Sequence, residues 1–186
     1  MIFLINKIVN LRNYIFTTQK LKSHGKNIKL PKDFSLKGKK YISIGNNFSS
    51  GRDLRLEAID SYYENKYEPN LKIGNNVSIN NNVHIGCINR IEIGDNCLIG
   101  SNVLITDHSH GNLDAPINGS FKIQNLYSKG EVIIKENVWI GENTCILAGV
   151  EIGNNVVIGC NTTVTKSLEP NSVYAGNPAK FIKKIK

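Results

Sequence analysis

An aliphatic residue recurs every six positions along most of this chain. The slots are Ile73, Ile79, Ile85, Ile93, Ile99, Ile105, Ile134, Ile140, Ile146, Ile152, Ile158 and Val164. A six-residue unit that contains a turn is too short for a hairpin and has the wrong period for a helix. We therefore expect each unit to form one side of a triangular coil, with each strand paired to the same strand one coil above.

Glycine and asparagine mark the turns between these units. Asparagine stands three positions after the aliphatic residue at Asn47, Asn76, Asn82, Asn96, Asn102, Asn137, Asn143, Asn155 and Asn161. Asparagine adopts the left-handed backbone conformation at low cost, so we expect positive φ angles there. The composition agrees, because 26 Ile and 26 Asn against 5 Ala favour strands broken by turns over helices.

The repeat resembles the hexapeptide repeat of left-handed parallel β-helix acyltransferases, over roughly residues 42 to 176. The resemblance implies an all-β solenoid, and it alone supplies the left hand, since the spacing does not. Complete coils are expected at 73–90, 93–110, 134–151 and 152–169, with an irregular coil near 42–59. The expected organisation is a basic N-terminal segment at 1–40, a β-helix at 41–176 and a basic C-terminal tail at 177–186.

Positive charge is concentrated at the two ends of the chain. The net charge is +8, yet residues 1–40 alone carry +9 and residues 178–186 carry +4, which leaves −5 for the body between them. An acidic body argues against a nucleic-acid partner. Basic ends instead suit an anionic small molecule or a membrane surface.

The N-terminal segment has the pattern of a helix with one apolar face, formed by Leu4, Ile8, Leu11 and Ile15. Charged residues interrupt its apolar runs, which excludes a signal peptide or a membrane span. The helix would pack between subunits or touch a membrane peripherally. Four cysteines without a CxxC pair indicate a reduced, cytoplasmic protein.

The repeat is interrupted once by a long insertion. Ile105 and Ile134 are 29 residues apart instead of six, which predicts an inserted loop at about 107–131. The sequences DHSHG, LYSKG, VWIGEN and AGNPAK resemble the sugar O-acetyltransferase branch, which includes galactoside, maltose and polysaccharide acetyltransferases. In that branch a histidine at the start of the loop is the general base, and His108 aligns with it.

The resemblance implies direct transfer of an acetyl group from acetyl-CoA. A neutral imidazole can take the proton of a sugar hydroxyl as the oxygen attacks the thioester. His108 would do this, with His110 as the second candidate. Asp107 or a backbone carbonyl would orient the ring, and the Gly141 N–H of a facing subunit would bind the oxyanion.

Two other chemistries are weaker interpretations of the same residues. A thiolate of Cys145 or Cys160 could form an acyl-enzyme, but neither has a histidine near it in sequence. His84, His108 and His110 could bind zinc, but their spacing differs from that of hexapeptide-repeat carbonic anhydrases. We therefore expect no metal.

Substrate contacts are carried over from the branch residue by residue. Asn80 and His84 are expected at the acceptor, although both could be plain exposed positions of the solenoid. Trp139 would border the thioester of CoA, or else pack between subunits. The remaining predicted cofactor contacts are Gly141, Gly159, Cys160, Thr165, Lys166, Lys180 and Lys183. Relatives often have Arg at the last two positions, so here we expect charge pairing with phosphate rather than bidentate contacts.

The sequence thus predicts an acetyl-CoA-dependent O-acetyltransferase that acts on a sugar hydroxyl in surface polysaccharide synthesis. We expect a homotrimer with three sites between subunits. Two alternatives stay open: N-acetylation of a nucleotide amino-sugar, and a non-catalytic β-helical scaffold. The scaffold would have no need of residues 107–110 or the loop.

Overall fold

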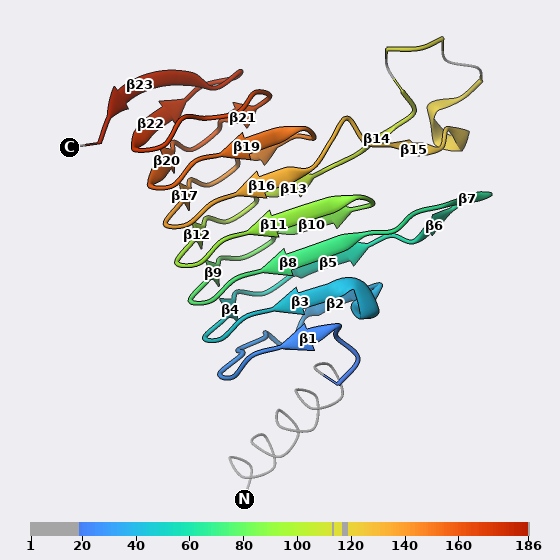
Figure 1. Ribbon diagram of the computed structural model, residues 1–186, viewed down its shortest axis with the longest axis horizontal. Coiled ribbons are helices and arrows are strands. Elements are labelled where there is room, and N and C mark those ends of the chain that lie inside the picture. The colour runs from blue at the N-terminus through green and yellow to red at the C-terminus, as the bar shows by residue number, and fades with distance from the viewer. Residues whose placement is uncertain (1–18, 113, 117–118, 186) are drawn as a thin grey trace, which may run out of the picture.

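The chain winds into stacked coils whose strands form the three faces of a prism, as the computed structural model shows for residues 19–112, 114–116 and 119–185 (Figure 1). Face 1 contains β1 (Ser23–His24), β3 (Ile42–Ile44), β8 (Asn70–Ile73), β11 (Arg90–Ile93), β16 (Val132–Ile134) and β19 (Val150–Ile152). Face 2 contains β4 (Ser49–Ser50), β9 (Ser78–Ile79), β12 (Leu98–Ile99), β17 (Trp139–Ile140), β20 (Val156–Ile158), β22 (Ser172–Ala175) and β23 (Lys180–Lys184). Face 3 contains β2 (Phe34–Lys37), β5 (Leu54–Ala58), β10 (His84–Cys87), β13 (Leu104–Thr106), β18 (Cys145–Ile146) and β21 (Thr163–Val164).

The strand register brings the repeated aliphatic residues into columns inside the prism. On face 1, for example, Ile73 pairs with Ile93, and Ile93 with Ile134, in parallel ladders. All twelve repeat positions are at most 3% exposed. Full burial of one such side chain is worth about 1.5–3 kcal/mol relative to exposure. The predicted parallel β-helix is therefore confirmed, and the aliphatic residues of the six-residue repeat form its core.

Asparagine closes the turns as the sequence predicts. All nine predicted positions have φ between 54° and 60°. Their side chains also form ladders from coil to coil, in which Asn47 donates to Asn76 at 2.9 Å and Asn76 donates to Asn96 at 3.0 Å. The same residue type thus supplies the backbone conformation and a hydrogen bond between coils.

Both ends of the solenoid extend beyond the boundaries that the sequence suggested. Strands β1 and β2 pair with β3 and β5, so the solenoid begins before residue 41, where its start was expected. At the other end β23 pairs antiparallel with β22, so Lys180–Lys184 forms a strand on face 2. The helix expected near residues 4–15 lies outside the described residues.

Helical structure is scarce in the part of the chain that the structure describes. It consists of two 3-10 turns, η1 (Lys39–Tyr41) and η2 (Phe121–Ile123). No helix among the described residues is long and apolar enough to cross a membrane.

Two insertions project from the corner at which face 3 leads to face 1 (Figure 1, right). One is a hairpin of β6 (Ser61–Tyr62) and β7 (Asn65–Lys66), in a stretch where the repeat is absent from the sequence. The other is the predicted loop, in which β14 (Ser109–His110) pairs antiparallel with β15 (Leu126–Tyr127). A small second core joins them and consists of Ile59, Ile88 and Leu126, with Tyr62 and Tyr67 packed against it.

Candidate active site

His108 lies where the long loop leaves the solenoid, two residues after the end of β13. Its side chain is only 13% exposed and packs over Gly86 of the coil below. A Cβ atom at Gly86 would stand 3.1 Å from His108 Cε1 and 3.5 Å from His84 Nε2. The missing side chain therefore makes room for two imidazole rings side by side.

Asp107 holds one nitrogen of the His108 ring. The carboxylate is fully buried and accepts hydrogen bonds from the backbone N–H groups of Ile88 at 2.9 Å and Asn89 at 2.8 Å. Its Oδ1 lies 3.0 Å from His108 Nδ1, while the Thr106 hydroxyl is 3.3 Å from the same nitrogen. With the proton on Nδ1 facing the carboxylate, Nε2 is the nitrogen that can accept a proton.

A second polar chain lies on face 3 beside this pair. His84 Nε2 is 3.0 Å from Glu57 Oε2, and Arg55 donates to the same oxygen at 2.7 Å. Burial lowers the pKa of His84, and the nearby Arg55 charge acts in the same direction. Burial alone would raise the pKa of Glu57, but the hydrogen bonds from Arg55 and His84 outweigh it and lower that pKa. The predicted acceptor residue His84 thus lies next to His108, in surroundings that disfavour its charged form.

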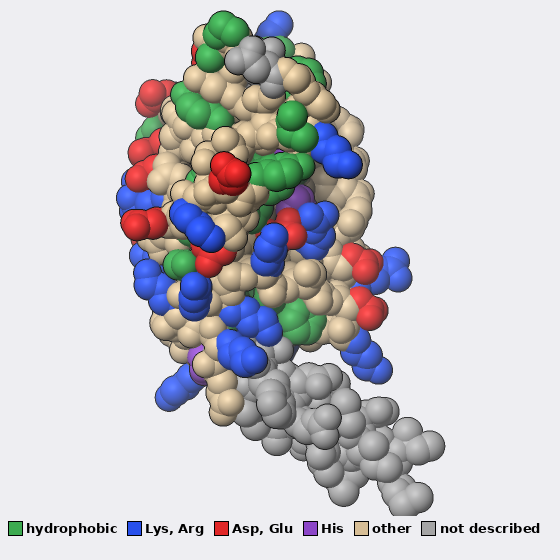
Figure 2. Space-filling model, turned by 90° about the vertical axis from the view of Figure 1, so that its right-hand side faces the viewer, with side chains coloured by type: hydrophobic (Ala, Val, Ile, Leu, Met, Phe, Trp, Pro, Cys, Tyr) green, Lys and Arg blue, Asp and Glu red, His purple; other side chains and the backbone are tan. Residues whose placement is uncertain are grey.

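A pocket of about 320 Å³ opens beside His108. It is lined by Thr106, His108, Ser109, Tyr127, Lys129, Leu147, Ala148 and Thr165. Figure 2 looks onto this side of the molecule and shows a histidine recessed between hydrophobic and charged side chains. The structure therefore brings the predicted base together with one predicted cofactor residue, Thr165.

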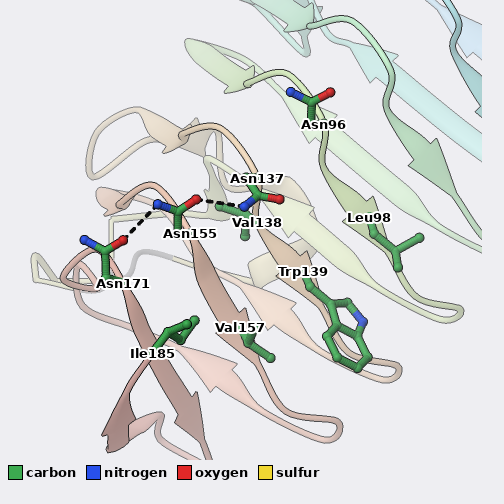
Figure 3. A pocket seen from close by; sticks show the side chains of 9 residues that line it. All are labelled: Asn96, Leu98, Asn137, Val138, Trp139, Asn155, Val157, Asn171 and Ile185. Carbon is green, nitrogen blue, oxygen red and sulfur yellow. Dashed lines mark hydrogen bonds between the residues drawn. The ribbon is translucent and has the colours of Figure 1, made fainter.

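Trp139 lies in a different hollow, on face 2 (Figure 3). It begins β17, its side chain is 53% exposed, and its neighbour Val138 points into the core. The hollow measures about 500 Å³ and is lined by Asn96, Leu98, Asn137, Val138, Trp139, Asn155, Val157, Asn171 and Ile185. Since the two pockets share no lining residue, one subunit does not unite Trp139 with His108.

The predicted glycines of the late coils are required by packing between coils. A Cβ at Gly141 would stand 2.6 Å from the backbone nitrogen of Cys160, and one at Gly159 would stand 3.0 Å from the Cβ of Ala175. The N–H of Gly141 donates to the Ile158 carbonyl at 2.8 Å. The expectation that this N–H binds the oxyanion is therefore wrong, because the solenoid ladder already uses it.

The other predicted contacts are dispersed over the surface. Asn80 is exposed after β9, at the corner between faces 2 and 3. Cys160 and Lys166 are exposed in the last coils, and Lys180 and Lys183 project from β23. His110 does not line the pocket; its ring makes an edge contact with Tyr62, with centroids 5.4 Å apart.

The hairpin supplies residues that sequence reasoning missed. The Tyr67 hydroxyl donates to the Leu126 carbonyl at 3.0 Å, and the hydroxyls of Tyr62 and Tyr63 donate to the Lys122 carbonyl at 3.2 and 3.1 Å. The Tyr67 bond reaches β15, the strand that carries Tyr127 into the pocket, and the other two bonds tie the hairpin to η2. The available signal was three tyrosines within residues 62–67, in a stretch that lacks the repeat.

Neither a metal cluster nor a cysteine–histidine pair is found in the described part of the chain. No three His, Cys, Asp or Glu side chains are grouped there to hold a metal ion, and no hydrogen bond links Cys145 or Cys160 to a histidine. Burial raises the pKa of Cys87 above its usual range and that of Cys97 to about 11. Both buried thiols are therefore protonated near neutral pH.

Two family models match the repeat itself. The model described as bacterial transferase hexapeptide (six repeats) matches residues 131–166, and the hexapeptide repeat of succinyl-transferase matches residues 90–107. WbbJ of Escherichia coli K12, assigned to lipopolysaccharide biosynthesis as an O-acetyl transferase, is 41% identical over 149 residues, which cover 77% of this chain and 71% of WbbJ. The chain therefore belongs to the hexapeptide-repeat acyltransferases.

Relatives and solved structures narrow the class to CoA-dependent acyltransferases. The galactoside O-acetyltransferase of E. coli K12 is 37% identical over 64% of this chain and 56% of its own length. A galactoside acetyltransferase structure with coenzyme A has a TM-score of 0.61 at 28% identity, over 91% of this chain and 68% of that one. A mutant of AntD, an N-acyltransferase from Bacillus cereus, bound to dTDP-4-amino-4,6-dideoxyglucose and coenzyme A, has a TM-score of 0.76 at 26% identity, over 94% of this chain and 89% of that one. Several other curated relatives match over only 34–59% of their length.

Proposed function

We propose that this chain transfers the acetyl group of acetyl-CoA to a hydroxyl group of a saccharide during assembly of a cell-surface polysaccharide. The observation that carries the proposal is the buried Asp107 carboxylate 3.0 Å from His108 Nδ1, beside a pocket of about 320 Å³. The identity to WbbJ and to galactoside O-acetyltransferase supports a saccharide hydroxyl as the acceptor. Its place of action is the cytoplasm, where acetyl-CoA is available.

His108 is the general base of this reaction. Its Nε2 takes the proton of the acceptor hydroxyl while the hydroxyl oxygen attacks the thioester carbonyl carbon. The tetrahedral intermediate then collapses, the carbon–sulfur bond breaks, and the imidazolium returns the proton to the leaving thiolate of CoA. Asp107 stabilises the transient imidazolium and keeps the ring in its working tautomer, because its own position is fixed by the backbone of Ile88 and Asn89.

The active enzyme is a homotrimer in which each site combines two subunits. Within one chain the His108 pocket and the Trp139 hollow are separate, although the chemistry needs the base beside the thioester. A neighbour packed around a threefold axis would bring its Trp139 and late coils against the projecting loop. The lysines of the last coils, Lys166, Lys180 and Lys183, would then bind the phosphates of CoA.

The second candidate is N-acylation of a nucleotide amino-sugar. It is favoured by the likeness to AntD, whose mutant structure contains such a sugar together with coenzyme A. The same base and the same cofactor serve both acceptors. A screen that measures thiol release from acetyl-CoA separates them, with sugars, nucleotide amino-sugars and lipid-linked oligosaccharides as acceptors. Release with amino-sugars alone would replace the O-acetyltransferase proposal, and release with none would refute both.

Complementation tests the shared site. A His108→Ala chain is refolded together with a Trp139→Ala, Lys180→Ala, Lys183→Ala chain, each inactive or impaired alone. Mixed trimers should regain activity, because some interfaces then combine an intact base with an intact cofactor groove. An active monomer in sedimentation, or inactive mixed trimers of verified composition, would place both halves of the site in one chain.

A further inference from the structure

The first coil of the solenoid has an unusual density of lysines. Eight lysines and one acidic residue, Asp33, lie between residues 19 and 40. The lysines are Lys20, Lys22, Lys26, Lys29, Lys32, Lys37, Lys39 and Lys40, and all are exposed except Lys39, which is half-buried. The first coil therefore forms a positively charged end of the prism.

Most of these lysines lack the ion pairs that several cations of the middle coils possess. Among the described residues, Lys40 is the one first-coil lysine with a carboxylate partner, Asp60 at 3.3 Å. Higher in the solenoid, pairs join neighbouring coils, as between Lys72 and Glu92 at 2.7 Å. Further pairs are Arg90 with Glu131 and Lys135 with Glu151. Like charges left uncompensated repel one another, so this end of the molecule suits an anionic partner.

The lysines are spread around the prism instead of converging on one point. Lys22 precedes β1 on face 1, Lys29 bridges to Ser49 on face 2, and Lys37 ends β2 on face 3. A single phosphate or nucleotide needs several cations within hydrogen-bond reach of one site. Cations distributed around the end of a solenoid match an extended anionic surface instead. Basic side chains are also visible around the lower coils in Figure 2.

We propose that the first-coil lysines dock the enzyme onto an anionic phospholipid bilayer, with the solenoid axis along the membrane normal. Lysines near such a surface each strengthen binding several-fold, and their flexible side chains can reach past the coil edge.

This orientation sets the height of the candidate active site above the lipid. On face 3, β13 is three strands above β2, so the residues just after β13, including His108, lie about 14 Å above the first coil at a strand spacing of ~4.8 Å. A saccharide linked to a lipid through phosphates would have its first sugars within this range. This use of the docking surface rests on the proposed function, whereas the docking itself does not.

The test is flotation of the full chain with vesicles of phosphatidylcholine containing phosphatidylglycerol. The variant Lys26→Gln, Lys29→Gln, Lys32→Gln, Lys37→Gln removes four first-coil charges. The control variant Lys166→Gln, Lys180→Gln, Lys183→Gln, Lys184→Gln removes the same charge at the opposite end. We expect the first variant to weaken vesicle binding by about 1,000-fold, at about 1 kcal/mol for each of the four lysines, with unchanged activity on a soluble acceptor, and the control to bind within about twofold of the wild type. Circular dichroism and sedimentation verify that both variants are folded.

Three results would overturn the docking surface. The wild type would not float with phosphatidylglycerol vesicles, or would float equally with phosphatidylcholine alone. Both variants would lose vesicle binding equally, which would indicate that the net charge of the protein governs binding and not the first-coil lysines. Inorganic pyrophosphate at low concentration would displace the protein from vesicles, which would indicate a point anion site. A protein that floats as expected but transfers no acetyl group would refute the proposed function and leave the docking surface intact.

Discussion

Two corners of the same prism differ in what they carry. The corner between faces 1 and 2 is closed in successive coils by an asparagine at positive φ, and these asparagines form ladders from coil to coil. The corner between faces 3 and 1 instead carries the β6–β7 hairpin and the long loop (Figure 1). The comparison shows that the repeat provides a rigid support, while the residues proposed for chemistry gather where the repeat is broken.

The Asp107 carboxylate, which faces His108, also stabilises the point where the long loop interrupts the repeat. In a regular coil, backbone N–H groups donate to the carbonyls of the next coil, as Ile59 does to Cys87. After β10, the N–H groups of Ile88 and Asn89 donate to the Asp107 carboxylate. One buried side chain thus replaces the lost ladder bonds and lies 3.0 Å from His108 Nδ1.

The largest expected effect at the corner between faces 3 and 1 is that of His108→Ala. Loss of a general base lowers turnover by ~10² to 10⁴. The substitution should leave trimer assembly unchanged and lower the melting temperature only slightly, because the ring lies outside both hydrophobic clusters and Asp107 keeps its bonds to the Ile88 and Asn89 N–H groups. Steady-state kinetics with acetyl-CoA measures the effect. His110→Ala is the matched control and should retain activity. More than half of wild-type turnover in His108→Ala would shift the base to His110.

At the corner between faces 1 and 2, Asn76→Ala should lower stability and leave activity unchanged. Asn76 has a φ of 54° and two side-chain ladder bonds. Alanine adopts a positive φ at greater cost than asparagine. This strain and the lost bonds should together lower the unfolding free energy by about 2–3 kcal/mol. Activity per folded molecule should not change. Chemical denaturation measures the loss, and Asn76→Gly should recover part of it because glycine tolerates this φ. Equal destabilisation by both variants would assign the whole effect to the ladder.

A smaller effect is expected at the far end of the prism. Lys180→Ala combined with Lys183→Ala should raise the acetyl-CoA KM by about tenfold at low salt and by less at high salt, because exposed charges are screened. The kcat should stay near that of the wild type. The pair Lys26→Ala, Lys29→Ala in the first coil serves as the control. A KM that does not change at either salt concentration would show that Lys180 and Lys183 are solvated side chains that do not bind the phosphates of CoA.

The regular part of the fold could be predicted from the sequence because each unit repeats the same local rule. The buried isoleucines and the positive φ angles of the asparagines follow from that rule. The early coils could not be aligned in the same way, since Leu54 and Leu56 stand there without the isoleucine–glycine signature. Arg55 and Glu57 were therefore missed, although strand register places them beside His84.

The partner of the candidate base could be narrowed from the sequence only to Asp107 or a backbone carbonyl. In an extended strand, side chains of adjacent residues point to opposite faces, so the pattern could not favour Asp107 over a carbonyl as the partner of His108. The chain instead bends at Asp107 directly after β13, so the two side chains meet. A local bend at the start of an insertion is invisible to a periodic pattern.

Tyr67→Phe tests whether the two insertions act together. The change removes one hydrogen bond to the Leu126 carbonyl, worth about 1 kcal/mol. It should loosen β15 and lower kcat/KM for the acceptor several-fold, with the acetyl-CoA KM unchanged and faster hydrogen exchange at residues 126–127. Tyr41→Phe removes a similar bond, to Asp60 at 3.1 Å, without touching the loop. Equal kinetic effects from both variants would show a general loss of stability instead of positioning.

The subtlest prediction concerns the protonation of His84. Burial and the Arg55 charge lower the pKa of His84, whereas Glu57 opposes them through its hydrogen bond at 3.0 Å and its negative charge. Glu57→Gln should therefore lower the His84 pKa further. Because the folded-state pKa lies below that of the unfolded chain, neutral His84 favours folding above the ordinary histidine pKa of ~6.5, and this contribution is lost as the pH falls. An NMR titration of the histidine Cε1–H signals measures the pKa directly.

Glu92→Gln is the control for this titration. Lys72 and Arg90 hold Glu92 on face 1, so its substitution should leave the His84 pKa unchanged. A His84 pKa that stays constant or rises in Glu57→Gln would show that the contact between His84 and Glu57 does not persist in solution.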